Sequence, residues 1–241
     1  IGEKALFVPI IGEKVDAHRF IDSAIARGAV AVLTSEHDEM QGDVPYIRVN
    51  NTTMALQDMG KEYGKQVIIP KIGVTGSVGK TTTKEMIASV LGTTWRVSKT
   101  PANHNNDIGM PMAILSMPED TQIAVLEMGM NHFGEIEYLT GIGCTDAAVI
   151  TNIGMSHIEN LGSQEGIFRA KMEMAERFTD KNTLFVNGDD KFLGSIGNTT
   201  YKVVRFGMAD TNDYYAKNIV YHAGYPSFDI YKKGEFLTHA S

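Results

Sequence analysis

Residues 73–86, GVTGSVGKTTTKEM, combine glycines, a lysine and threonines in an order that is typical of phosphate-binding loops. The spacing differs from the common form G-x-x-x-x-G-K-S/T, because Val74 stands five positions before Gly79, where that form has glycine. The context still favours a phosphate site, since an apolar strand is expected at 72–75 and a helix from Thr81. A glycine turn beside a surface lysine is the alternative, which the coincidence of strand, glycines, Lys-Thr and helix disfavours.

Each part of such a loop has its own chemistry. Backbone N–H groups of residues 76–79 and the positive end of the following helix would surround phosphate oxygens. Lys80 would reach the β- and γ-phosphate oxygens, and the hydroxyl of Thr81 would ligate the magnesium ion that these oxygens share. The sequence therefore predicts a nucleotide site at this loop.

Two further candidates follow expected strands. Glu127 comes after the apolar residues 123–126, where a carboxylate would face the phosphate loop and suit a hard cation such as Mg²⁺. An exposed glutamate at a strand end is the alternative. His157 lies in the loop after the strand expected at 147–153, and for a lone histidine there a functional and a structural role are equally open.

Lys171 lies among apolar residues. In the helix expected over 163–178 these residues recur at helical spacing, and Lys171 comes four residues after Ile167 and three before Met174. Spacing alone favours a lysine that extends its amine to water. A lysine held away from water would instead lose its proton easily, react with carbon dioxide and then offer oxygen ligands.

Two polar loops offer amide, imidazole and carboxylate groups. The stretch TPANHNNDIGMP has asparagines that could hydrogen-bond a phosphate or a substrate carboxylate, although asparagine also simply forms turns. The stretch EMGMNHFGEIEYL has polar residues beside a helix start. These candidates are Asn103, Asn105, Asn106, Asn131, His132 and Glu135.

The elements that must position these residues form two units. Residues 1–69 are expected to form a small α/β domain with a helix in 16–28, strands at 29–34 and 45–50, and a helix over 52–59 that weakens near Gly64. A domain boundary is expected at Pro70, because long apolar runs alternate with helices from there on.

Residues 70–241 are expected to form a phosphate-loop mononucleotide-binding domain. Their apolar runs are continuous rather than alternating, which indicates strands covered on both faces and a largely parallel sheet, with ligands at the carboxyl ends of the strands. The tail from about residue 214 alternates with period two and predicts an antiparallel β appendage. The expected strands are 72–75, 123–126, 147–153 and 183–186, and the expected helices are 81–91 and 163–178.

Composition limits the partners. The 241 residues carry a net charge of −7, with 43% apolar and 21% charged residues, as globular proteins do. The negative charge disfavours nucleic acid and anionic membranes as partners, and no apolar run reaches the roughly 18 residues of a membrane span. The single cysteine, Cys144, fits a reducing cytoplasm. We expect a cytoplasmic monomer, and a start without Met indicates that the beginning is missing.

Five motifs occur in the order and kind found in the Mur ligases, and the resemblance covers nearly all 241 residues. The motifs are TGSVGKTTTKEM, NHNNDIGMP, EMGMNHFGEI, TNIGMSHIENLGS and EGIFRAKMEM. The family's own loop form, T-G-x-x-G-K-T/S, accounts for the unusual spacing. The stretch ALFVPIIGEKVDAHRF also resembles the family's amino-terminal domain.

The resemblance implies an ATP-dependent amide ligase of peptidoglycan precursor synthesis. It would join D-alanyl-D-alanine to UDP-N-acetylmuramoyl-tripeptide through an acyl phosphate, with residues 1–69 holding the uridine-nucleotide end of the substrate. Thr81 and Glu127 would hold a first magnesium ion, and His157 with a carbamylated Lys171 a second, which reverses the preference for a water-facing lysine. The resemblance further implies ATP binding by Gly76, Ser77, Val78, Gly79, Lys80, Thr81 and Thr82, and catalysis by Lys80, Lys171, His157 and Asn106.

The sequence departs from the family in two respects. It has no third, carboxyl-terminal domain and no adenine-contacting H-N-x-x-N stretch. We therefore expect the 241 residues to fold and to bind nucleotide weakly, but not to complete ligation on their own. A sister ligase that adds the third amino acid, or a folylpolyglutamate-type ligase, is an alternative that NHNNDIGMP and NHFGEI disfavour. A nucleotide-binding module without ligase activity is the other alternative. The guanine-reading motif N-K-x-D is absent from the sequence, which disfavours a GTPase of this kind.

Overall fold

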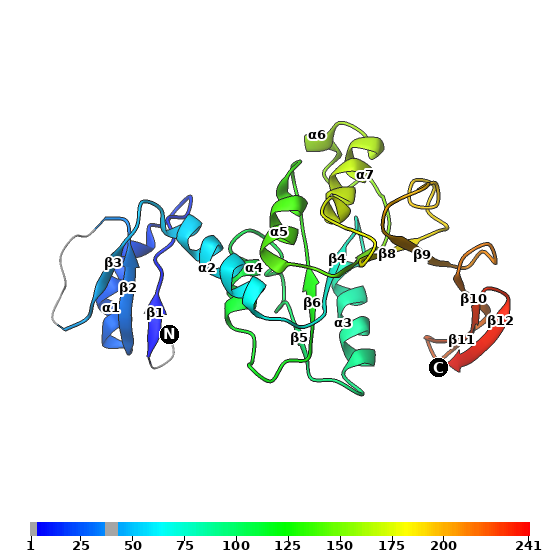
Figure 1. Cartoon of the computed structure of the whole chain (residues 1–241), viewed down its shortest axis with the longest axis horizontal. Helices are drawn as coiled ribbons and strands as arrows, with labels where there is room; N and C mark the ends of the chain where they lie inside the picture. The colour runs from blue at the N-terminus through cyan, green and yellow to red at the C-terminus, as the bar shows by residue number, and fades with distance from the viewer. Residues whose placement is uncertain (1–3, 37–42) are drawn as a thin grey trace.

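The computed structural model describes residues 4–36 and 43–241, which form two β-sheets joined through the long helix α2, Thr52–Gln66 (Figure 1). The smaller sheet holds three parallel strands in the order β1 (Ala5–Phe7), β2 (Ala29–Thr34) and β3 (Tyr46–Arg48). A 3-10 helix, η1 (Ala17–Phe20), and helix α1 (Ile21–Ala26) connect β1 to β2. The helix expected in 16–28 is therefore present but split into two short turns.

Helix α2 is longer than its sequence predicts, since it runs through Gly60 and through Gly64, where it was expected to weaken. Both glycines lie against the larger unit: a Cβ atom on Gly60 would be 2.5 Å from Cβ of Pro111, and one on Gly64 would be 2.6 Å from the carbonyl oxygen of Ile142. The helix therefore packs closely on α4 (Gly109–Leu115) and α5 (Glu135–Gly143). The expected domain boundary at Pro70 stays a prediction.

The larger sheet has nine strands in the order β12-β11-β10-β9-β8-β7-β4-β6-β5. The strands from β5 to β10 pair in parallel, and β10, β11 and β12 pair antiparallel, so both the parallel sheet and the antiparallel appendage are confirmed. The bounds are β4 (Lys71–Thr75), β5 (Val97–Lys99), β6 (Ile123–Glu127), β7 (Ala147–Ile150), β8 (Thr183–Asn187), β9 (Lys202–Gly207), β10 (Tyr214–His222), β11 (Tyr225–Lys232) and β12 (Glu235–Ala240).

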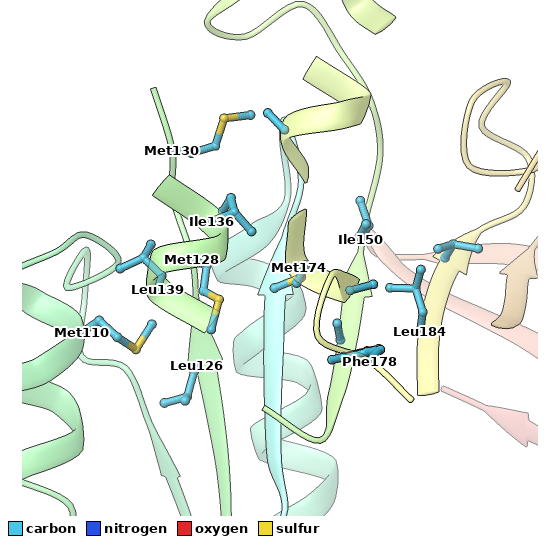
Figure 2. Packing of buried hydrophobic residues seen from close by; sticks show 14 of the residues in the cluster. Met110, Leu126, Met128, Met130, Ile136, Leu139, Ile150, Met174, Phe178 and Leu184 are labelled. Carbon is cyan, nitrogen blue, oxygen red and sulfur yellow. The ribbon is translucent and has the colours of Figure 1, made fainter. Parts of the chain in front are cut away.

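Helices cover both faces of the parallel part of this sheet. On one face, α5, α7 (Gln164–Met172) and the 3-10 turn η2 (Glu173–Ala175) pack on a core that includes Leu126, Met128 and Met174 (Figure 2). On the other face, α3 (Lys80–Leu91) packs on a smaller cluster around Val74 and Val149. This two-sided burial explains the continuous apolar runs, because side chains on both faces of these strands leave water.

The central strands end close to their expected positions, except that β7 ends at Ile150, three residues early. The reason is local, since Thr151 and Asn152 turn away to hydrogen-bond the phosphate loop. The short helix α6 (Ile158–Leu161) follows. Within residues 4–36 and 43–241, every helix is too short or too polar to cross a lipid bilayer.

Candidate nucleotide-binding and catalytic site

Three neighbouring strands direct the expected site residues to one edge of the larger sheet. Strand β4 lies between β6 and β7, and all three run parallel, with Val74 opposite Glu127 and Thr75 opposite Ile150. The loops that leave their carboxyl ends are the phosphate loop 76–79, the loop 128–134 and the loop 151–157. Residues that are far apart in the sequence therefore meet at one edge, as parallel sheets require of their ligand sites.

The phosphate loop depends on two glycines for its shape. Gly79 has φ 81°, in the left-handed region, and directly precedes α3. Gly76 has φ 154°, and a Cβ atom there would lie 1.8 Å from Oγ1 of Thr151, so no side chain fits. The first N–H groups of α3 have no acceptor within the helix and lie at its positive end, beside the exposed Thr81 and Thr82. This end of α3 suits an anion such as phosphate.

Lys80 lies over this loop. Its Nζ donates to the carbonyl oxygen of Gly76 at 2.9 Å, and the side chain is half-buried. Burial lowers the pKa of Lys80, and the nearby Glu127 carboxylate opposes that shift. The amine is therefore placed close to both the loop and the buried acid.

Glu127 is buried, with 2% of its surface exposed, so the alternative of an exposed strand-end glutamate is wrong. Its Oε1 accepts from Nδ2 of Asn105 at 2.9 Å, and its backbone N–H donates to Oγ1 of Thr100 at 2.7 Å. Its Oε2 is buried and has no hydrogen-bond partner within the described residues, although Nζ of Lys84 lies 3.7 Å away. A carboxylate oxygen in this state fits a divalent cation, which prefers oxygen ligands.

His157 is exposed and starts helix α6 with φ 64°, an uncommon conformation for a residue with a side chain. Asn106 is also exposed, and its Oδ1 accepts from the N–H of Gly109 at 2.8 Å, so it helps to start α4. Both residues line one polar cavity of about 850 Å³ together with Lys80 and with Gln57 of α2. The cavity therefore lies between α2 and the edge of the sheet that carries the phosphate loop.

Lys171 is 2% exposed on α7, so most of its side chain is buried, more than the interpretation from spacing alone, a lysine extending its amine to water, suggests. Burial, with a smaller contribution from the positive charge of Lys80, lowers the pKa of Lys171 to about 7. No hydrogen bond or ion pair of its amine is found in the part of the chain that the structure describes. A large fraction of the amine is therefore neutral near pH 7 and nucleophilic.

Two residues that the sequence interpretation missed also contribute. Lys84 has no exposed surface, and its amine donates to the carbonyl oxygen of Thr100 at 2.8 Å. It lies four residues after Lys80 and four before the buried Ala88, so helical spacing could have found it. Asn152 hydrogen-bonds the phosphate loop, and no pattern in the sequence marks that role.

Comparisons with known proteins identify the family of the chain. A sequence model described as the Mur ligase middle domain matches residues 74–240, and one described as the Mur ligase family, catalytic domain, matches residues 1–70. The chain belongs to the Mur ligase family. The matched residues include the phosphate loop, Glu127, His157 and Lys171.

Individual Mur ligases are similar over most of the chain. The UDP-N-acetylmuramoyl-tripeptide–D-alanyl-D-alanine ligase of Bacillus subtilis strain 168 is 44% identical over 218 residues, which are 89% of this chain and 47% of the relative. A crystal structure of MurF from Acinetobacter baumannii matches with a TM-score of 0.87 at 30% identity, covering 98% of this chain and 52% of that one. MurF from Thermotoga maritima in complex with ADP matches with a TM-score of 0.86 at 30% identity, covering 98% and 54%. The chain thus spans about half the length of the Mur ligases that it matches.

Proposed function

We propose that this chain is the nucleotide- and acceptor-binding part of an ATP-dependent ligase that joins D-alanyl-D-alanine to UDP-N-acetylmuramoyl-tripeptide. The observation that carries the proposal is the meeting of a phosphate loop and a buried carboxylate at one edge of the sheet, with the buried Lys171 near Lys80. Within the described residues, one oxygen of that carboxylate accepts no hydrogen bond. The similarity to D-alanyl-D-alanine ligases supports the choice of the two substrates. Cytoplasmic location and monomeric state stay predictions.

ATP would be held by residues 76–82, with Lys80 beside the β- and γ-phosphates. The first-turn N–H groups of α3 supply hydrogen bonds that are already oriented, so little reorganisation is needed when negative charge moves among the phosphate oxygens. Thr81 and Glu127 would ligate one magnesium ion, and His157 with a modified Lys171 a second. Bound magnesium would supply neutralisation of the phosphate charge. The free Oε2 of Glu127 is the observation that fits such an ion.

We further propose that Lys171 carries a carbamate. Its neutral amine would attack carbon dioxide, a C–N bond would form, and the nitrogen would release one proton to solvent. The product is an anion whose two oxygens can ligate a cation, whereas the free amine is positive or neutral. Burial of the amine without a carboxylate partner supports this modification, because the unmodified ammonium form is poorly compensated there.

The two chemical steps each form one bond and break one. First, a carboxylate oxygen of the tripeptide attacks the γ-phosphorus of ATP, and ADP leaves, which gives an acyl phosphate. Next, the amine of D-alanyl-D-alanine attacks the acyl carbon, the tetrahedral intermediate expels phosphate, and the nitrogen loses its proton. The chain's part in this chemistry is positioning, for which the cavity of about 850 Å³ beside Lys80, Asn106 and His157 offers room. Asn106 could donate through its amide nitrogen to the attacking carboxylate or to phosphate.

We also propose the domain roles. Residues 1–69 would hold the uridine-nucleotide end of the acceptor, and residues 70–241 would hold ATP. Support comes from the cavity, which is lined by Met54 and Gln57 of α2 on one side and by Lys80 and His157 on the other. The peptide end of the acceptor would then lie near the γ-phosphate while its nucleotide end extends toward the smaller sheet.

The decisive experiment measures phosphate release and product mass with the complete protein. We expect phosphate release only when ATP, UDP-N-acetylmuramoyl-tripeptide and D-alanyl-D-alanine are all present, with a product whose mass equals the two substrates minus water. Glu127→Gln and Lys171→Met should lower the rate by about 10²-fold or more, because each removes a group beside the reacting phosphate. Lys202→Met, an exposed substitution at the other end of the sheet, should leave the rate unchanged.

Other outcomes point to other functions. Turnover with a single amino acid in place of the dipeptide would identify a sister ligase, and turnover with glutamate and a folate would identify a folylpolyglutamate-type ligase. Nucleotide binding without a joined product from any of these pairs would refute ligase activity. ¹³C-bicarbonate provides a separate test of the carbamate: a new carbonyl signal should be present in the wild-type protein and absent from Lys171→Met.

A further inference from the structure

Asn152 binds the peptide backbone of the phosphate loop with both ends of its side-chain amide. Its Oδ1 accepts from the N–H of Val78 at 3.0 Å, and its Nδ2 donates to the carbonyl oxygen of Val78 at 3.1 Å. Its own carbonyl oxygen accepts from the N–H of Ser77 at 3.1 Å. One residue of the loop after β7 therefore satisfies three backbone groups of the phosphate loop.

Neighbouring residues extend this contact. Oγ1 of Thr151 donates to the carbonyl oxygen of Val78 at 2.7 Å, and the lack of a side chain at Gly76 makes room for it. The N–H of Gly154 donates to Oγ of Ser77 at 2.8 Å. The segments 76–78 and 151–154 are thus paired along their length, although they are more than seventy residues apart in the sequence.

The pairing decides which loop N–H groups are available to a ligand. Those of Ser77 and Val78 are directed at Asn152, so they do not face a phosphate in this conformation. The N–H groups of Gly79 and of the first turn of α3 remain for an anion. Fewer N–H groups of residues 76–79 are therefore available to a phosphate than the sequence indicates. The orientation of the available N–H groups depends on how firmly the Val78 peptide is held.

We propose that Asn152 is a positioning residue of the nucleotide site. It holds the Val78 peptide so that the N–H groups from Gly79 onward face the β-phosphate, and it fixes the loop that carries His157 five residues later. Since Asn152 is neutral and its hydrogen bonds within the described residues go to backbone groups, it acts through the loop and not on the ligand's charge. This inference rests on the proposed binding of ATP or ADP at the phosphate loop.

The test compares ADP with AMP, which lacks the β-phosphate, in the complete protein with EDTA present. In the wild-type protein, the dissociation constant of AMP divided by that of ADP measures how much the β-phosphate contributes to binding. Asn152→Ala should lower this AMP/ADP ratio by about tenfold, since two hydrogen bonds that order the loop are lost. Amide hydrogen exchange at Val78 should become faster in the same variant, because its N–H loses its acceptor. Thr151→Val, which removes one hydrogen bond to the same peptide, should lower the ratio by about threefold.

Asn182→Ala is the matched control. Asn182 also joins two backbone segments through its amide, since Oδ1 accepts from the N–H of Thr179 at 2.8 Å and Nδ2 donates to the carbonyl oxygen of Asp146 at 3.0 Å. It lies beside the amino ends of β7 and β8, away from the phosphate loop. Asn182→Ala should lower the free energy of unfolding by about as much as Asn152→Ala does, and it should leave the ratio of the AMP and ADP dissociation constants unchanged.

The outcomes separate the two proposals. An unchanged ratio in a folded Asn152→Ala, or an equal fall in Asn182→Ala, would overturn the positioning role. If Asn152→Ala does not fold, Thr151→Val decides, and an unchanged ratio there would overturn it as well. Equal affinity of the wild-type protein for ADP and AMP would contradict the proposed nucleotide site itself.

Discussion

Replacing Lys171 by methionine should remove a dependence of stability on pH that the wild-type protein shows. The side chain is buried in α7, and its pKa is lowered from 10.5 to about 7, first by burial and then by the charge of Lys80. Between these two values the unfolded chain binds a proton that the folded chain does not. The free energy of unfolding of the wild-type protein therefore rises as pH rises through this window. Methionine has a similar length and does not titrate.

The size of the effect follows from the two pKa values. Each pH unit inside the window is worth about 1.36 kcal/mol, so raising the pH from 6 to 9 should stabilise the wild-type protein by about 2.5 kcal/mol relative to Lys171→Met. Most of the rise falls between pH 7 and 9, because below pH 7 both states are protonated. The burial of an ammonium group costs most at low pH, where Lys171→Met should be the more stable protein.

Urea unfolding at pH 6, 7, 8 and 9 measures this difference, in buffers free of bicarbonate, nucleotide and divalent metal. Distant titrating groups contribute equally to both proteins, so the difference between them reports Lys171 together with its coupling to Lys80. Lys202→Met, which replaces an exposed lysine, should differ from the wild type by an amount that does not change with pH. A wild-type minus Lys171→Met difference that stays flat within about 0.5 kcal/mol from pH 6 to 9 would refute a desolvated amine at this position.

Two further changes test the packing that holds the site. Gly60→Ala should destabilise the protein by about 1–2 kcal/mol in urea unfolding, because its Cβ atom would lie 2.5 Å from Pro111. Gly141→Ala is the control: its Cβ atom would lie 3.8 Å from the nearest atom, so the better helix propensity of alanine should stabilise the protein by up to about 1 kcal/mol. Lys84→Met should lower the free energy of unfolding by about 3–5 kcal/mol, because it leaves the buried Glu127 without the cation at 3.7 Å. Lys99→Met is the control: it breaks an exposed pair with Glu85 and should lower the free energy of unfolding by less than about 1 kcal/mol. Equal losses of stability in the two variants would contradict the role of the buried charge.

The central part of the fold was predictable because burial leaves a mark in the sequence. The runs that form β6 and β7 are apolar at successive positions, and β4 and β8 have shorter apolar stretches, as expected of strands covered on both faces. Strands β1 and β5 are three residues long and partly exposed, so each is too short to be recognised as a strand from its own residues. Their pairing with longer neighbours makes them strands, and pairing partners are not visible in a single sequence.

The candidate site was predictable where position after a strand and side-chain chemistry agree. Lys80, Glu127 and His157 all follow the carboxyl ends of parallel strands, and the register of β4 with β6 and β7 brings those ends together. The burial of Lys171 was not predictable from helical spacing, since spacing shows which face points inward but not whether the amine can reach water. Asn152 gave no signal because its partners are backbone atoms of a distant loop, and every residue type has those.

The charges at this edge of the sheet are only partly compensated without ligands, although Nζ of Lys84 lies 3.7 Å from Oε2 of Glu127. Burial and, to a smaller extent, the positive charge of Lys80 disfavour the charged form of Lys171, as its lowered pKa reflects. Oε2 of Glu127 is buried beside them without a hydrogen bond among the described residues. Burying such groups without a partner costs free energy, so this edge of the sheet should bind ligands that match its charges. The matching groups are an anion beside Lys80, a cation on Glu127, and a modification that turns the positive charge of Lys171 into a negative one. A nucleotide's phosphates, a divalent cation and a carbamate together supply these three, and any one of them alone leaves a charge unmatched.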